Sequence, residues 1–152
     1  MIEKNAAKQI SGYKGGQDIR ERAFAFACRV VLLCQNLYEA GGVGRLLVYQ
    51  LLTCSGSTAT MLEEGRAAES DADFVSKCSI SLKECRESWT RLRICAWCRL
   101  GPEKEVKELV QESSELIAII NTIIRNKRLK MKVATPGKRR RPQSPPSHLL
   151  NS

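Results

Sequence analysis

The stretch SDADFVSKCSISLKECRESWTRLRICAWC, residues 70–98, decides the fold. Its apolar and small side chains recur at three- and four-residue spacing, which is typical of one long amphipathic helix. Ser70 is a suitable N-cap because its hydroxyl can accept a hydrogen bond from the backbone N–H of Asp73, and Asp71 adds negative charge at the positive end of the helix dipole. On the polar side, Lys83 and Glu87 have the spacing of an i,i+4 ion pair. The predicted apolar stripe contains Phe74, Cys78, Ser81, Leu82, Cys85, Trp89, Leu92, Cys95 and Ala96.

A helix of this length cannot bury its own apolar stripe and needs partners of similar length. At 1.5 Å per residue, about 29 residues extend roughly 43 Å. Beside this helix at about residues 70–99, the sequence predicts helices at about 17–40, 45–68 and 102–130, separated by Gly41–Gly44 and by Gly101-Pro102. Four long helices with short connections predict an all-α, up-down-up-down antiparallel four-helix bundle over residues 17–130.

The run CSGSTAT, residues 54–60, is rich in small side chains. Glycine and threonine are poor helix formers, yet their small size lets a neighbouring helix approach closely. We therefore expect the helix at 45–68 to continue through this run. The alternative, a phosphate-binding loop, requires a lysine and a preceding strand that the sequence lacks.

The two ends differ from the body of the chain. Residues 1–16 are polar and glycine-containing and are expected to form a flexible leader, whereas the Pro-, Ser- and Arg-rich residues 131–152 are expected to form a disordered basic tail. The chain carries 25 Lys and Arg against 16 Asp and Glu, a net charge of +9. Nine basic residues and no acid follow residue 124, so this end holds the whole excess. These nine are Arg125, Lys127, Arg128, Lys130, Lys132, Lys138, Arg139, Arg140 and Arg141.

The basic end allows three interpretations. It can bind nucleic-acid phosphates, it can serve only as a solubilising segment, or it can attach to an anionic membrane or act in targeting. Arg91, Arg93 and Arg99 would extend the same basic surface if the bundle brought them to that end.

The first predicted helix carries apolar residues outside its main stripe. Phe24, Cys28, Leu32 and Leu33 lie off that stripe, and a helix that is apolar on more than one side is buried on more than one side. In a four-helix bundle the additional side faces another subunit. We therefore predict that these four residues form an oligomer interface.

The seven cysteines indicate reduced thiols. Their number is odd, at least five occupy apolar helical positions, and no N-terminal signal segment is recognisable, so we expect a cytoplasmic protein without a disulfide framework. The longest apolar run, residues 23–34, is interrupted by Arg29 and is too short to span a bilayer. The CxxC motif of Cys95 and Cys98 ends a helix, where the dipole opposes thiolate formation. Ordinary thiols are favoured there over a zinc ligand pair or a redox pair.

No catalytic constellation is apparent in the sequence. A di-iron bundle needs two Glu-x-x-His motifs, but the only histidine is His148 in the tail. Glutamates at 63, 64, 84 and 87 are interpreted as solvated, or as partners of Lys77, Lys83 and Arg86, rather than as an acid/base set. We expect no enzyme activity, no cofactor and no metal.

Part of the chain resembles a known family. The residues Ala67-Ala68-Glu69-Ser70, Asp73-Phe74, Lys77, Ser79-Ile80, Leu82-Lys83-Glu84 and Arg86-Glu87-Ser88 look like the signature of bacterial four-helix bundle proteins encoded by intervening sequences in 23S ribosomal RNA genes. The family is similar to the accessory variability determinant of diversity-generating retroelements. The resemblance covers about residues 18–130. The chain departs from it at Met61, where relatives carry asparagine, and at Thr90-Arg91, where they carry Tyr-Trp.

The resemblance implies an assembly and a partner. Relatives form five-membered rings, and the retroelement branch binds a reverse transcriptase and nucleic acid. A pentamer of this chain would gather about 45 positive charges and gain affinity by multivalency. We therefore predict a non-enzymatic homo-oligomer, with the pentamer as the form that the resemblance implies. It is expected to bind RNA or DNA through its basic end, with a reverse transcriptase or ribosomal component as a further partner and no membrane. The alternative is a protein-interaction scaffold with a solubilising tail.

Overall fold

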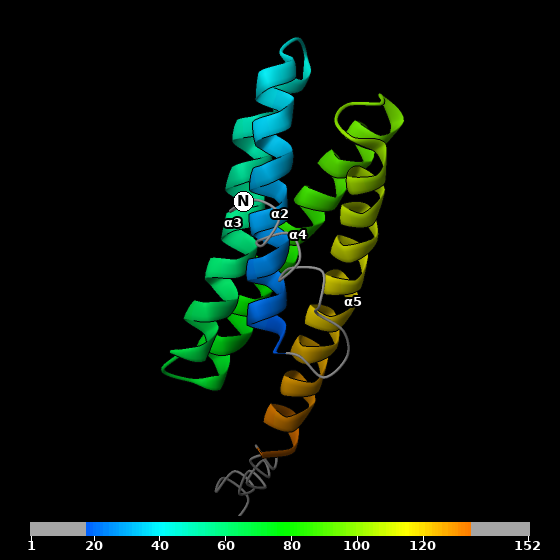
Figure 1. Cartoon of the computed structure of the whole chain (residues 1–152). Helices are drawn as coiled ribbons and strands as arrows, with labels where there is room; N and C mark the ends of the chain where they lie inside the picture. The colour runs from blue at the N-terminus through cyan, green and yellow to red at the C-terminus, as the bar shows by residue number, and fades with distance from the viewer. Residues whose placement is uncertain (1–17, 135–152) are drawn as a thin grey trace, which may run out of the picture.

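The computed structural model describes residues 18–134, which form four helices and no strand (Figure 1). The helices are α2 (Ile19–Ala40), α3 (Gly44–Arg66), α4 (Asp71–Trp97) and α5 (Glu103–Ala134). The predicted all-α class is confirmed. The predicted leader at 1–16 lies outside the described residues, as does the tail beyond 134. Residues 131–134, predicted as the start of the tail, are instead the last turn of α5.

The helix boundaries follow local chemistry. Ser70 caps α4 as predicted, since its Oγ accepts from the backbone N–H of Asp73 at 3.1 Å. Asp18 caps α2 in the same way through the N–H of Arg20. The turn between α4 and α5 requires Gly101, whose φ of 78° is left-handed. A Cβ at that position would lie 2.7 Å from Cδ1 of Leu33, so this turn packs directly on α2.

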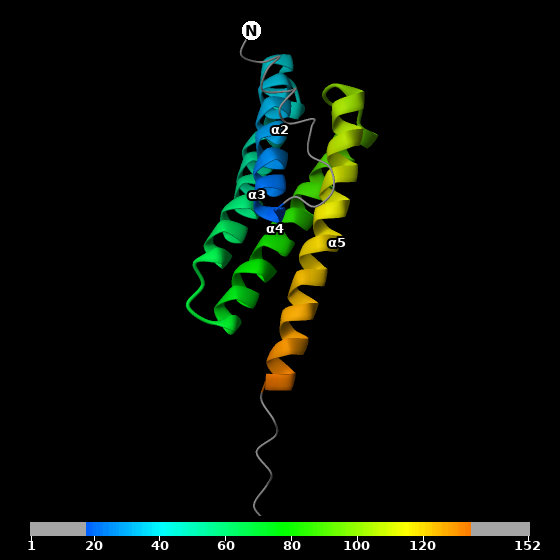
Figure 2. The same ribbon diagram turned by 60° about the horizontal axis from the view of Figure 1, so that its bottom comes forward.

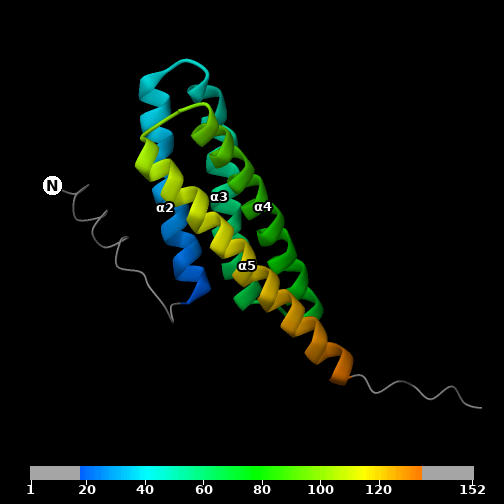
Figure 3. The same cartoon turned by 90° about the vertical axis from the view of Figure 1, so that its right-hand side faces the viewer.

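Consecutive helices pack antiparallel along their lengths, and α2 also meets α5 (Figures 1 and 3). Arginine–glutamate ion pairs join α2 and α5 at the edge of their contact. Arg22 makes a bidentate contact with Glu112, at 2.6 and 2.8 Å, and Arg29 pairs with Glu105 at 2.9 Å. The cations of α2 are therefore largely committed to holding the bundle together.

Small hydroxyl residues line the contact between α3 and α4. Thr58 and Ser81 are fully buried, and the Ser81 hydroxyl donates to the Thr58 carbonyl across the two helices at 2.7 Å. Ser88 approaches the Sγ of Cys54 at 3.0 Å. The α3 helix continues through residues 54–60 as predicted, and its small side chains allow this close approach.

Two predicted features of α4 are wrong. Trp89 is half-buried and Ala96 is exposed, while Ser88 occupies the core position. The step of three residues from Cys85, to Ser88, points into the core, and the step of four, to Trp89, turns towards the surface. The Lys83–Glu87 pair is also absent from the described structure, because Glu87 pairs with Arg91 at 3.2 Å.

Candidate nucleic-acid interface

The basic end of the described chain is the last part of α5. This part extends past the other three helices (Figures 1 and 2). No acid occurs from residue 125 onward. Arg125, Arg128 and Lys132 have i, i+3, i+7 spacing and therefore share one side of the helix, with Lys130 on another. All four side chains are exposed.

Lys127 differs from its neighbours because the bundle holds it. Its Nζ lies 2.6 Å from Oδ1 of Asp71, at the start of α4, and 5.5 Å from the ring centroid of Phe74. Within residues 18–134, no ion pair is formed by Arg125, Arg128, Lys130 or Lys132. Lys127 therefore anchors the end of α5, while the other four cations remain available to an anionic ligand. The remaining predicted binding residues, Lys138, Arg139, Arg140 and Arg141, lie outside the described residues.

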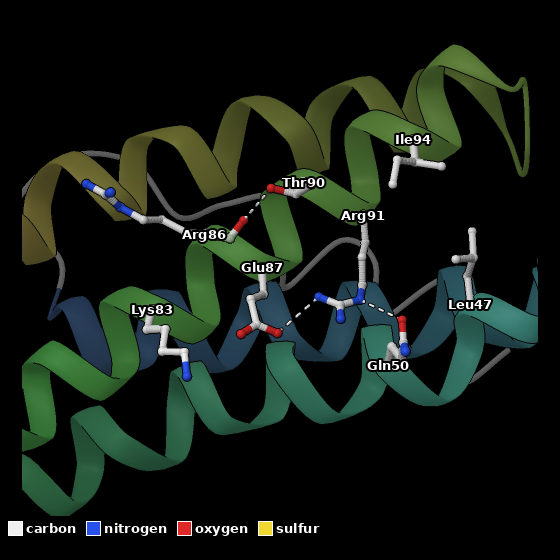
Figure 4. Close-up of a pocket in the computed structure, with 8 residues that line it drawn as sticks. All are labelled: Leu47, Gln50, Lys83, Arg86, Glu87, Thr90, Arg91 and Ile94. Atoms are coloured by element: carbon white, nitrogen blue, oxygen red, sulfur yellow. Dashed lines mark hydrogen bonds and ion pairs between the residues drawn. The ribbon is translucent and has the colours of Figure 1, made fainter.

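The structure does not bring Arg91, Arg93 and Arg99 to this surface. The Lys127–Asp71 contact places the end of α5 beside the start of α4, and the two helices run antiparallel. From Asp71 to the far end of α4 the helix extends about 40 Å at 1.5 Å per residue. These three arginines therefore lie towards the opposite end of the bundle. Arg91 is also engaged by Gln50 at 3.0 Å (Figure 4).

Three of the four residues predicted for an oligomer interface on α2 are at least partly accessible to solvent. Phe24 is 62% exposed and Leu32 is 41% exposed, with Cys28 half-buried between them. Leu33 is only 2% exposed and belongs to the core of the monomer, so its assignment to an interface is wrong. Its position on α2 points it towards the α4–α5 turn, against Gly101.

Three of the four glutamates singled out in the sequence form ion pairs in the described chain, and the sequence identifies their partners only in part. Glu64 pairs with Lys77 at 2.8 Å as expected, whereas Glu63 pairs with Arg20 at 3.3 Å and Glu87 with Arg91. The open groove between α3 and α4 contains the Glu87–Arg91 pair (Figure 4). Such paired, accessible charges stabilise helix contacts and provide no general base held near a nucleophile.

The cysteines are free thiols in the described structure. Cys95 is buried and Cys98 is exposed, so the CxxC motif does not present two sulfurs to one ligand. Burial raises the pKa of the Cys95 thiol to about 11 and that of Cys85 to about 12. Within residues 18–134, no three His, Cys, Asp or Glu side chains are grouped so that they could hold a metal ion.

Comparisons with known proteins assign the chain to a family. A family model described as 23S rRNA-intervening sequence protein matches residues 16–122, more than half of the sequence. The chain belongs to this family. It is also similar to a solved structure of a protein of unknown function from the S23 ribosomal protein family of Bacteroides thetaiotaomicron, with 25% identity and a TM-score of 0.64 over 70% of this chain and 98% of that one. A comparison with curated proteins finds no match.

In this member of the 23S rRNA-intervening sequence protein family, the match ends at residue 122, before the basic end begins. The family match therefore does not include the cations at the end of α5. None of the four described helices combines the length and apolar character that crossing a bilayer demands.

A second group of cations lies on α4, in positions where the sequence predicted other roles: Lys83 and Arg86 as partners of glutamates, and Arg93 as an extension of the basic end. Lys83, Arg86 and Arg93 form no ion pair within the described chain, and Trp97 beside them is 90% exposed. Their helical spacing within residues 70–98 already places these positions on the side away from the core.

Proposed function

We propose that this protein is a non-enzymatic, homo-oligomeric bundle that binds RNA or DNA through the basic end of α5 and the basic residues that follow it. The observation that carries the proposal is the contrast within one short segment. Lys127 is neutralised by Asp71, whereas Arg125, Arg128 and Lys132 share an exposed side with no acid partner in the described structure. Unpaired cations in such an array attract phosphates and release counterions on binding.

The proposal includes an accessory role in an rRNA intervening-sequence or reverse-transcription system. It is supported by the name of the family, which refers to a 23S rRNA intervening sequence. A reverse transcriptase or a ribosomal component would then be a protein partner of the assembly. The location of the coding sequence, inside an rRNA gene or beside a reverse-transcriptase gene, would distinguish the two systems.

Binding is tested with three forms of the protein: the full chain, a chain ending at Ala134, and the full chain with Arg125, Arg128, Lys130 and Lys132 all replaced by glutamine. Anisotropy of a labelled RNA duplex gives the affinity of each. We expect the full chain to bind most tightly and both altered forms to bind more weakly, because each loses cations that would contact phosphates. Equal and weak binding by all three forms would refute the proposal.

Self-association is proposed to use the exposed apolar side of α2. Phe24 and Leu32 leave apolar surface in water, which a second copy of the chain would cover. Phe24→Asp is expected to shift sedimentation of the full chain towards the 17 kDa monomer. Thr122→Asp, an exposed position on α5, is the matched control and should leave the assembly intact. Monomeric native protein would contradict this part of the proposal.

A protein-interaction scaffold is the second candidate function. It is supported by further exposed apolar side chains on α3, where Leu46 is 76% and Tyr49 is 77% exposed. Assembly that depends on Phe24, together with no measurable RNA or DNA binding by the full chain, would favour this second function.

A further inference from the structure

One exposed side of α4 carries a regular series of residues. Lys83, Arg86, Thr90, Arg93 and Trp97 have i, i+3, i+7, i+10 and i+14 spacing, and we call this series the α4 stripe. The buried residues of α4, from Cys78 to Cys95, occupy the opposite side. The stripe extends about 21 Å along the helix at 1.5 Å per residue. It is distinct from the basic end of α5, which lies beside the start of α4.

The three cations of the α4 stripe have no acid partner among residues 18–134. Arg91, which lies next to the stripe, shows the contrast, because Glu87 and Gln50 both bind its guanidinium. In Figure 4, Arg91 is joined to these two side chains, whereas the charged groups of Lys83 and Arg86 are joined to none. The stripe therefore presents positive charge that the fold does not use.

Two aromatic side chains complete this surface. The guanidinium of Arg93 lies over the ring of Trp89, with its Cζ 4.4 Å from the ring centroid, so its orientation is held before any ligand binds. Trp97, one turn further along, is 90% exposed, the largest fraction among the described large apolar side chains. An indole in this position has an accessible π-face beside a pre-oriented cation.

We propose that the α4 stripe binds single-stranded nucleic acid, with a base stacked on Trp97 and phosphates bound by Arg93, Arg86 and Lys83. Charge complementarity selects a polyanion, and stacking selects one with unpaired bases, because a duplex keeps its bases inside the helix. Acidic side chains would engage the cations but have no π-face to stack on the indole. The proposal adds a second surface to the nucleic-acid-binding function and depends on different residues, so either can fail alone.

The test uses the full-length chain and two labelled probes, a 15-nucleotide oligo(U) and a 15-base-pair RNA duplex. Trp97→Ala is expected to weaken oligo(U) binding roughly tenfold, the order expected for loss of one base–aromatic stack. It should leave duplex binding unchanged. Trp97→Phe retains a π-face and should bind oligo(U) nearly as well as the native chain. Trp97→Leu, which is apolar without a π-face, should behave like Trp97→Ala.

The outcomes separate this inference from the proposed function. Unchanged oligo(U) binding by Trp97→Ala, or native affinity in Trp97→Leu, would overturn the stacking site whatever the α5 variants do. A change in sedimentation by Trp97→Ala with oligo(U) binding unchanged would assign the surface to a contact between copies and would also overturn it. If the glutamine variants of α5 retain duplex binding while Trp97→Ala loses oligo(U), the α4 stripe stands and the proposed role of α5 fails.

Discussion

Replacing Leu33 by alanine should destabilise the bundle far more than replacing its neighbour Leu32. Leu33 is 2% exposed and packs on the Gly101 turn, where one of its methyl groups occupies the space that a Cβ would enter. Removing a fully buried leucine side chain costs the transfer of its methyl and methylene groups plus a cavity, about 3 kcal/mol of unfolding free energy. Leu32 is 41% exposed, and its truncation should cost about 1 kcal/mol within one bundle.

The measurement is urea unfolding followed by circular dichroism at 222 nm, made at two protein concentrations. An assembly that forms only from folded chains makes stability rise with concentration. Leu33→Ala should lower the unfolding free energy at both concentrations, while Leu32→Ala should mainly reduce the concentration dependence, because its exposed part is proposed to contact another copy. Equal losses for the two variants at low concentration would show that the inward side of α2 has been assigned incorrectly.

Two further predictions concern groups whose protons or reactivity the fold controls. In a thiol-labelling time course at pH 8, the exposed Cys98 should react fastest and the half-buried Cys28 more slowly. Contact of α2 with another copy would protect Cys28 further. Rapid labelling of all seven cysteines would contradict the described burial. Hydrogen bonds from Gln111 and Arg22 lower the pKa of Glu115, so the unfolded chain takes up this proton first as pH falls. The stabilisation from this lowered pKa is present above the ordinary glutamate pKa of about 4.3 and is lost at lower pH. Glu115→Gln should therefore make the melting temperature fall less steeply between pH 7 and 3. An unchanged pH profile in Glu115→Gln would contradict this role of Glu115.

The sequence predicted the fold because helix boundaries and core spacing are local properties. Ser70 and its aspartates mark the start of α4, and the glycines and Pro102 separate the helices, independently of the tertiary structure. The predicted bounds differ from the observed ones by a few residues at most, apart from α5, which continues to Ala134. Lysines and aliphatic residues near its end keep the helical pattern past residue 130.

The remaining details depend on how each helix is rotated and how closely it approaches its neighbours. Leu33 fits the core by its spacing alone, since it follows Val30 by three residues and precedes Leu37 by four, and all three are buried. Its assignment to the interface together with Leu32 placed that face of α2 incorrectly. Trp89 was assigned to the core by its spacing from Cys85 and Leu92, yet Ser88, one residue earlier, is the buried position. Sequence spacing restricts the rotation of a helix to a few choices, and contacts with the neighbouring helices decide among them.

The candidate site was predictable as a concentration of charge and not as a set of contacts. Counting residues locates the basic end, but Lys127 pairs with Asp71, which lies far from it in the sequence. That pairing follows from the register between α4 and α5. It divides the predicted cations of α5 into one that anchors the helix and four that have no acid partner in the described chain.

The most direct test of the central claim is the salt dependence of RNA binding in two variants that lose equal charge from α5. In one, Arg125 and Arg128 become glutamine; in the other, Lys104 and Lys107 at the opposite end do. The slope of log affinity against log salt concentration changes by about 0.9 for each phosphate contact on a duplex. The first variant should reduce the slope by about 2 and the second should leave it near the native value. Equal slopes in both variants would contradict a phosphate-binding surface at the end of α5.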